Sequence, residues 1–286
     1  MEKKSVLVPT ISCHTDTYYP RIEFEDVTIM LQGILNPAID IIYTIDQYLE
    51  VCPNIILSIY QKTEDPSLIE RIKRFPTVQI VDNDLEEYKN ELKFLNCDIN
   101  AWRNSVYFHL NTTQKGLNLV KTKYVIKSRV DHFYTNIKDM ITLSKDSGKI
   151  VCSSFPVEGI YHKFFLSECL FGGLTHEVQR VVKLSLLNYC KQDYDENHPE
   201  VLFWRPYILY KMQLENIDYT NDEAYLDFLE KYFIIWPLNH SSYYKMKIFK
   251  GWICERMEFL KTKTTREYLT QGSDIELVIQ EFLRPK

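Results

Sequence analysis

Short apolar runs alternate with stretches of helical periodicity over the first 84 residues of the chain. Residues 26–35, 54–60 and 77–84 predict buried strands, because each is short and apolar and ends at turn-forming residues. Residues 38–50 and 66–75 lie between these strands and predict helices. Strands that alternate with helices in this way are typical of a mostly parallel sheet covered by helices on both faces.

The same alternation continues through the rest of the chain. Residues 85–97 are polar and charged and predict a surface segment, which is followed by a long helix over about residues 99–118. The later elements are predicted as strands at 124–126, 148–155 and 232–238, a short apolar segment at 166–170, and helices at 175–191 and 199–215. We therefore predict an α/β fold with a mostly parallel central sheet flanked by helices, and a mainly helical C-terminal part.

No repeat, low-complexity tract or Gly/Ser linker divides the chain. Its 286 residues therefore predict one compact unit, with residues 1–215 as the main domain and residues 216–286 as an extension packed on it.

Composition narrows the class of protein. A net charge of −5 and a pI of about 5.9 give no basic field, so we expect no nucleic-acid partner. No run reaches the ~20 apolar residues that span a bilayer, so we predict no transmembrane segment. The seven cysteines are scattered singly, which favours reduced thiols in a soluble cytoplasmic protein over a zinc ribbon or a disulfide scaffold.

A polar cluster follows the strand predicted at 124–126 and contains Lys127, Ser128, Arg129 and Asp131. The carboxyl edge of an open α/β sheet is where ligands bind, so this cluster is our main candidate site. Arg129 would contact a phosphate, and Asp131 would contact a sugar or Mg²⁺, which proteins bind through one or two carboxylates and substrate phosphates. The alternative is a surface ion pair between Arg129 and Asp131, which is worth little energetically.

Two further groups of polar residues have a functional and a structural interpretation. Gln32 and Gly33 follow the first strand, where a glycine either lets the backbone approach a ligand or simply forms a turn. Asn100, Arg103 and Asn104 share one helix face, which either holds a phosphate or ribose or is a solvated face.

Glu168 stands beside an apolar segment, which would make it a general base whose pKa is raised by burial. The alternative is a helix start, with Ser167 as the N-cap and Glu168 in the first turn. Pro199 and Glu200 open a helix, where Glu200 would contact sugar hydroxyls or complement the helix dipole. The histidines are dispersed and suggest no metal-ligand set.

Several of these segments form an ordered set: Leu31-Gln32-Gly33-Ile34, Pro53 with Ile55 to Tyr60, Asn100 to Asn104, Lys121 to Asp131, Ser167 to Gly172, and Pro199-Glu200. In this order they resemble the WavE family of lipopolysaccharide-synthesis proteins, which are regarded as GT-A-type glycosyltransferases. The resemblance spans roughly residues 26–210.

The chain departs from the family pattern at four places. Ile34 stands where the family has proline, and Asn104 where it has glutamine. Glu168 replaces an aspartate, and a carboxylate moved by about 1 Å can change catalysis. His132-Phe133 follow Asp131, so the second aspartate of a D-x-D motif is missing and metal dependence is in doubt.

The resemblance implies a GT-A-like domain that binds a nucleotide-sugar donor, with a UDP-sugar favoured, and a surface-glycan or oligosaccharide acceptor. It implies a cytoplasmic location, in a bacterium or in the host of a virus. Asp131 would bind the donor sugar or a divalent cation, Mn²⁺ or Mg²⁺. Glu168 would deprotonate the acceptor hydroxyl in a single displacement that inverts the anomeric centre. The nucleotide, ribose and diphosphate would be held by Gln32, Gly33, Asn100, Arg103, Asn104 and Arg129.

Two other classes of protein stay open. A nucleotidyltransferase can share the α/β sheet, although that class usually has a glycine-rich basic loop near the first strand, where this chain has only Gln32 and Gly33. A non-catalytic nucleotide- or sugar-binding protein on a degenerate transferase scaffold would explain the missing second acidic residue after Asp131.

Overall fold

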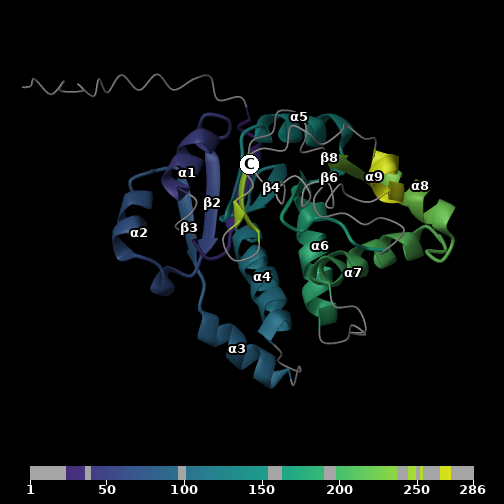
Figure 1. Ribbon diagram of the computed structural model, residues 1–286, viewed down its shortest axis with the longest axis horizontal. Helices are drawn as coiled ribbons and strands as arrows, with labels where there is room; N and C mark the ends of the chain where they lie inside the picture. The colour runs from purple at the N-terminus through teal and green to yellow at the C-terminus, as the bar shows by residue number, and fades with distance from the viewer. Residues whose placement is uncertain are drawn as a thin grey trace, which may run out of the picture.

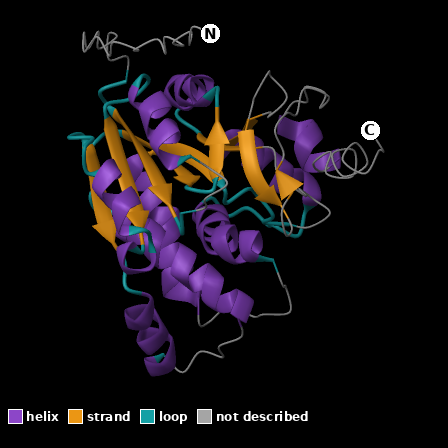
Figure 2. Ribbon diagram, turned by 60° about the vertical axis from the view of Figure 1, so that its left-hand side comes forward, coloured by secondary structure: helices purple, strands orange, loops and turns teal. Residues whose placement is uncertain are grey.

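The structure is a computed structural model that describes residues 24–35, 40–95, 101–153, 163–189, 198–236, 244–248, 252–253 and 265–271. Its main feature is a central sheet packed among helices (Figure 2). This sheet has seven strands in the order β3-β2-β1-β4-β7-β6-β8. The strands are β1 Val27–Gln32, β2 Asn54–Ile59, β3 Val78–Asp82, β4 Tyr124–Arg129, β6 Ile150–Ser153, β7 Leu170–Leu174 and β8 Phe233–Trp236. β7 pairs antiparallel with both of its neighbours, and every other pair is parallel. The predicted α/β fold with a mixed, mostly parallel sheet is confirmed.

Helices cover both faces of this sheet (Figure 1). One face packs against α1 Ile41–Leu49, α2 Pro66–Ile72 and α5 Ile137–Ser147. The other face belongs to a core that includes α3 Leu85–Phe94, α4 Ala101–Leu117, α6 Thr175–Asn188, α7 Pro199–Leu214 and α8 Asp222–Tyr232. Because both faces are covered, all six residues of β1 are buried, and the strand is a continuous apolar run with one polar residue, Thr28, before its final Gln32.

β4 and β7 lie unusually close together at Gly172. A Cβ added there would come within 2.3 Å of Ile126 Cδ1 and 2.7 Å of the carbonyl oxygen of Val125. Gly172 and Gly173 both lie inside β7. The missing side chain therefore lets β7, and the residues just before it, sit directly against β4.

Two expectations about element boundaries were wrong. Residues 85–97 do not form an irregular surface segment, because α3 occupies Leu85–Phe94. Asp84 caps this helix by accepting hydrogen bonds from the amides of Glu86 and Glu87, and Tyr88 and Leu92 are buried one turn apart. β4 also continues to Arg129 instead of ending at residue 126.

The C-terminal part contains α8 and α9 Thr265–Gln271, and it also contributes strands. β8 joins the main sheet beside β6, whereas β9 Tyr244–Ile248 and β10 Trp252–Ile253 form a small antiparallel sheet with β5 His132–Tyr134. A short 3-10 helix, Gln61–Thr63, follows β2. The division at residue 215 stays a prediction. Within the described ranges, no helix is both long and apolar enough to cross a membrane.

Candidate functional site

A cavity of about 500 Å³ lies where β1 and β4 end at the carboxyl edge of the main sheet. This volume is in the range of sites for small ligands and cofactors. One part of its wall is made of apolar and aromatic side chains, and another part is made of polar and charged side chains. The apolar part includes Leu35, Tyr60, Leu85, Val106 and Phe108, and the polar part includes Gln32, His109, Arg129, Asp131 and Glu168.

Most of the predicted site residues meet at this cavity. Gln32 and Arg129 are register partners on the neighbouring strands β1 and β4, and Glu168 lies just before β7, which pairs with β4. Arg103 and Asn104 belong to the first turn of α4, but their side chains are outside the described part of the structure. Asn100 lies outside the described residues altogether.

Gly33 lines the cavity, but it does not offer its amide to a ligand. Its N–H donates to the carbonyl of Ser58 at 3.1 Å, and its φ of +130° is in the region that favours glycine. The backbone turn itself therefore explains this residue.

Arg129 and Asp131 form a bidentate pair at the polar end of the cavity. Arg129 Nε donates to Asp131 Oδ1 at 2.9 Å and NH2 donates to Oδ2 at 2.8 Å. Burial by itself would raise the pKa of Asp131, but the bonds from Arg129 lower it to about 2. The carboxylate is thus ionised at neutral pH and fixes the plane of the guanidinium, so the pair is part of the cavity wall rather than a simple surface ion pair.

The predicted cation site at Asp131 does not fit this arrangement. Both carboxylate oxygens already accept hydrogen bonds from Arg129, whose positive charge would lie beside any bound cation. The next nitrogen, His132 Nε2, is 3.8 Å from Asp131 Oδ1. In the part of the chain that the structure describes, no three His, Cys, Asp or Glu side chains gather as metal ligands do. We therefore derive no chemical step through a metal ion.

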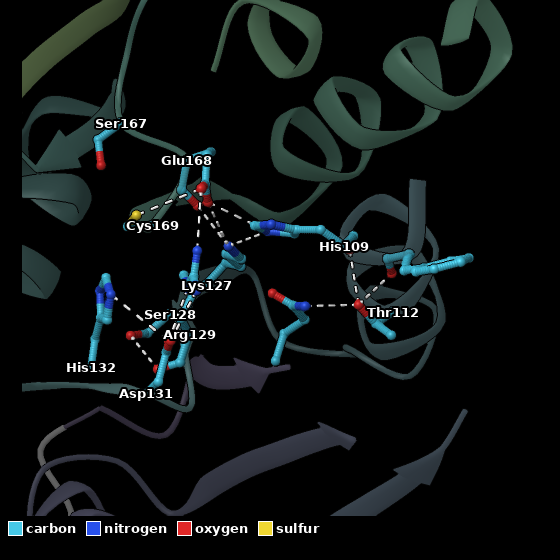
Figure 3. A network of polar contacts seen from close by, with 12 residues as sticks. His109, Thr112, Lys127, Ser128, Arg129, Asp131, His132, Ser167, Glu168 and Cys169 are labelled. Atoms are coloured by element: carbon cyan, nitrogen blue, oxygen red, sulfur yellow. Dashed lines mark hydrogen bonds and ion pairs between the residues drawn. The ribbon is translucent and has the colours of Figure 1, made fainter. Parts of the chain in front are cut away.

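Glu168 lies in a charged cluster with residues of β4 and α4 (Figure 3). Its residue is 5% exposed, and its Oε2 is 3.6 Å from both Lys127 Nζ and His109 Nε2. Its Oε1 is 3.6 Å from Arg129 NH1. Oε2 accepts no hydrogen bond from any described residue, so a buried carboxylate at the cavity has an unused acceptor.

Lys127 is fully buried in β4 and connects the other members of the cluster. Its Nζ donates to His109 Nε2 at 2.6 Å and to the backbone carbonyl of Glu168 at 2.6 Å. Burial and the charge of Lys127 lower the pKa of His109 to about 3, so the imidazole is neutral, accepts at Nε2 and carries its proton on Nδ1. Burial also lowers the pKa of Lys127 itself, to about 8.

The predicted direction of the Glu168 pKa is wrong. Burial does act to raise it, as expected, but the surrounding side chains of His109, Lys127 and Arg129 outweigh burial and lower the pKa to about 2. Glu168 is therefore ionised at neutral pH. The helix-start alternative is also wrong, because β7, not a helix, follows Glu168.

Gln32 provides a second unused acceptor at the cavity. Thr112 Oγ1 contacts the carbonyls of Phe108 and His109 at 2.8 and 2.9 Å, so its single proton is committed and its oxygen must accept from Gln32 Nε2 at 2.8 Å. This bond fixes the orientation of the Gln32 amide. Oε1 is then left buried with no partner in the described structure, and an N–H or O–H of a ligand would satisfy it.

Sequence reasoning missed His109 and the role of Lys127. Nothing near His109 in the sequence indicates a site, because α4 brings it to β4 only in the folded chain. The position of Lys127 could have been predicted from strand alternation. Lys127 lies two residues after Val125 in β4, so both side chains point to the same face of the sheet, and Val125 packs in the core that includes α4, α6 and α7. Pro199 at the start of α7 also lines the cavity, next in sequence to the predicted Glu200.

No protein-family model and no curated protein matches the chain, so the WavE resemblance stays a prediction. Solved structures of low sequence identity are similar to part of the chain. An active-site mutant of LgtC has a TM-score of 0.43 and 9% identity, over 63% of this chain and 71% of that one.

Two further solved structures are similar to the chain. HddC from Yersinia pseudotuberculosis has a TM-score of 0.34 and 16% identity, over 54% of this chain and 78% of that one. The 4-diphosphocytidyl-2C-methyl-D-erythritol synthase from Anaerococcus prevotii has a TM-score of 0.36 and 13% identity, over 63% of this chain and 81% of that one. At these scores the likenesses do not choose between activities, so the function has to be inferred from the geometry of the cavity.

Proposed function

We propose that this chain is a glycosyltransferase that moves a sugar from a nucleotide-sugar donor to a surface-glycan or oligosaccharide acceptor. The observation that carries the proposal is the Glu168 carboxylate, which lines the same cavity as Arg129 at the carboxyl edge of the sheet and has one oxygen, Oε2, that accepts no hydrogen bond from a described residue. A transferase of this kind needs a cation for the diphosphate of the donor and a carboxylate for the acceptor hydroxyl, and the cavity has both.

In this proposal the nucleotide lies along the end of β1. The apolar and aromatic part of the wall, including Tyr60 and Phe108, would contact the nucleobase, and Gln32 Oε1 would accept a hydrogen bond from the nucleotide. Arg129 would contact the diphosphate and stabilise the charge that develops on the leaving nucleoside diphosphate.

Glu168 is the proposed general base. Its ionised carboxylate accepts the proton of an acceptor hydroxyl, the hydroxyl oxygen bonds to the anomeric carbon, and the bond to the diphosphate oxygen breaks. A pKa of about 2 makes the free carboxylate a weak base. A bound diphosphate beside Arg129 would offset the positive charge that lowers this pKa, and would therefore raise the proton affinity of Glu168 in the complex.

Lys127 and His109 are the proposed positioning residues. Lys127 holds the backbone of Glu168 at 2.6 Å and donates to His109, which in turn lies 3.6 Å from the carboxylate. When the acceptor oxygen attacks the anomeric carbon on the face opposite the leaving group, the configuration inverts, and we expect NMR of the product to show the opposite anomeric configuration to the donor. Retention would contradict Glu168 as the base.

The test is to incubate the purified chain with UDP-, GDP-, CMP- and dTDP-sugars, with and without oligosaccharide acceptors, and to measure the released nucleotide. We expect one donor class to be consumed, and the release to be lost in Glu168→Gln. Formation of pyrophosphate from a nucleoside triphosphate and a sugar phosphate would instead support a nucleotidyltransferase. Nucleotide binding with no turnover of any donor would support the non-catalytic binding protein.

A further inference from the structure

We propose that Arg129, oriented by Asp131, binds the diphosphate directly, and that this chain binds a nucleoside diphosphate without a divalent cation. The inference rests on the proposed function, because it concerns how the nucleotide of the donor is held. It assigns Asp131 a different role from the metal ligand that the sequence suggested.

The first observation is the state of the Asp131 carboxylate. A divalent cation needs carboxylate oxygens whose lone pairs point at the metal, and Mg²⁺ also demands a nearly octahedral set of such ligands. Arg129 already donates to Oδ1 at 2.9 Å and to Oδ2 at 2.8 Å. A cation would therefore have to displace a bidentate, partly buried guanidinium and then remain next to its charge.

The second observation is the part of Arg129 that remains available. A guanidinium has five N–H donors, and Asp131 takes one from Nε and one from NH2. NH1 is 3.6 Å from Glu168 Oε1, beyond hydrogen-bond distance, and makes no hydrogen bond to a described residue. The side chain is 36% exposed and lines the cavity, so the unused donors are accessible to a ligand. A planar guanidinium with a fixed orientation suits the oxygens of a phosphate.

The third observation is the distribution of charge around the cavity. Arg129, Asp131 and Glu168 line the cavity, and Lys127 lies buried behind Glu168, so this group holds two cations and two carboxylates. Lys127 is fully buried and faces Glu168, which leaves Arg129 as the exposed cation among these four side chains. A metal-dependent site has excess carboxylates that a cation neutralises. Here the described charges are balanced, and a fixed cation is placed where an anion can reach it.

The experiment is calorimetric titration of UDP, GDP, CDP and dTDP into the full chain, in EDTA and again with Mg²⁺ or Mn²⁺. We expect the nucleotide that binds best to have the same Kd in all three conditions, within about threefold. Arg129→Met should weaken binding by about 10- to 100-fold, the range of a hydrogen bond to a charged group. Arg180→Met removes a comparable ion pair with Glu177 outside the cavity, and should leave Kd unchanged.

Asp131→Asn separates the two roles of the carboxylate. If Asp131 only orients Arg129, Asp131→Asn should change the Kd of the nucleotide by no more than about threefold. The variant holds Arg129 less firmly, but it also removes a negative charge near the diphosphate, and the two effects offset each other. Binding that appears only with a cation, and that disappears in Asp131→Asn, would overturn the inference and leave the proposed function in place. If the folded protein bound none of the four nucleotides in any condition, both the inference and the proposed function would fall.

Discussion

The two carboxylates that form ion pairs with β4 at the cavity differ in how their hydrogen bonds are satisfied. Asp131 accepts two hydrogen bonds from Arg129, and the pair is partly exposed. Glu168 lies 3.6 Å from Lys127, is almost completely buried and has one oxygen with no hydrogen bond to a described residue. Since a buried polar group without a partner is costly, the difference separates a carboxylate that orients a neighbour from one that is available to a substrate.

The largest expected effect is on the turnover rate, when Glu168 is substituted. Glu168→Gln should lower kcat by about 10²- to 10⁴-fold, the usual contribution of a general base, while Kd for the nucleotide stays within a fewfold. Released nucleotide and calorimetric titration measure the two quantities. Glu168→Asp keeps the charge and shortens the side chain, and should retain part of the activity. Full activity of Glu168→Gln would contradict the proposed role.

The second effect is on stability, at the lysine behind Glu168. Lys127→Met should lower the free energy of unfolding by about 3–5 kcal/mol, because it leaves a buried carboxylate without one of its two nearby cations. Urea denaturation measures the change. In a double variant with Glu168→Gln the loss should be partly recovered, whereas additive losses would show that the two charges are not coupled.

The third effect is how the free energy of unfolding depends on acid pH through the Arg129–Asp131 pair. The pKa of Asp131 is lowered from 3.8 to about 2, so the unfolded state binds more protons over this range, and the free energy of unfolding falls as pH drops through it. The contribution is on the order of 2 kcal/mol, present above about pH 4 and lost towards pH 2. Denaturation curves at both pH values should therefore differ less for Asp131→Asn than for the unmodified chain. An equal acid loss in both would contradict this interpretation of the pair.

The smallest effect concerns Gln32, whose Oε1 is the other unused acceptor. Gln32→Leu should weaken nucleotide binding by about five- to tenfold, because one hydrogen bond of about 1 kcal/mol is lost. The same change should leave the stability of the free protein nearly unaltered, since the loss of the hydrogen bond to Thr112 is offset by the removal of a buried acceptor without a partner. Calorimetry and urea denaturation measure the two effects. Unchanged Kd would show that Gln32 does not contact the nucleotide, and Gln114→Leu on an exposed part of α4 is the control.

Much of the sheet could be predicted because burial on both faces makes its strands apolar runs with turn residues at their ends. The main error in this region was α3, whose charged residues concealed the two buried positions, Tyr88 and Leu92. The end of β4 was placed too early for a related reason: Lys127 and Ser128 look like surface residues but are buried inside the strand. A buried lysine is stable only with partners that lie elsewhere in the sequence.

The sequence by itself determined the fold class and the edge of the sheet at which the polar residues collect, because both follow from local periodicity and strand direction. It also indicated Gln32, Arg129, Asp131 and Glu168 as site residues. Only the tertiary structure decided what each can do. His109 reaches the site from α4, and Arg129 donates hydrogen bonds to the carboxylate of Asp131. Lys127 and Arg129 help to reverse the pKa shift that burial would give Glu168. Hydrogen bonds and charges act over a few ångströms between segments far apart in the chain, and those distances are set only by the fold.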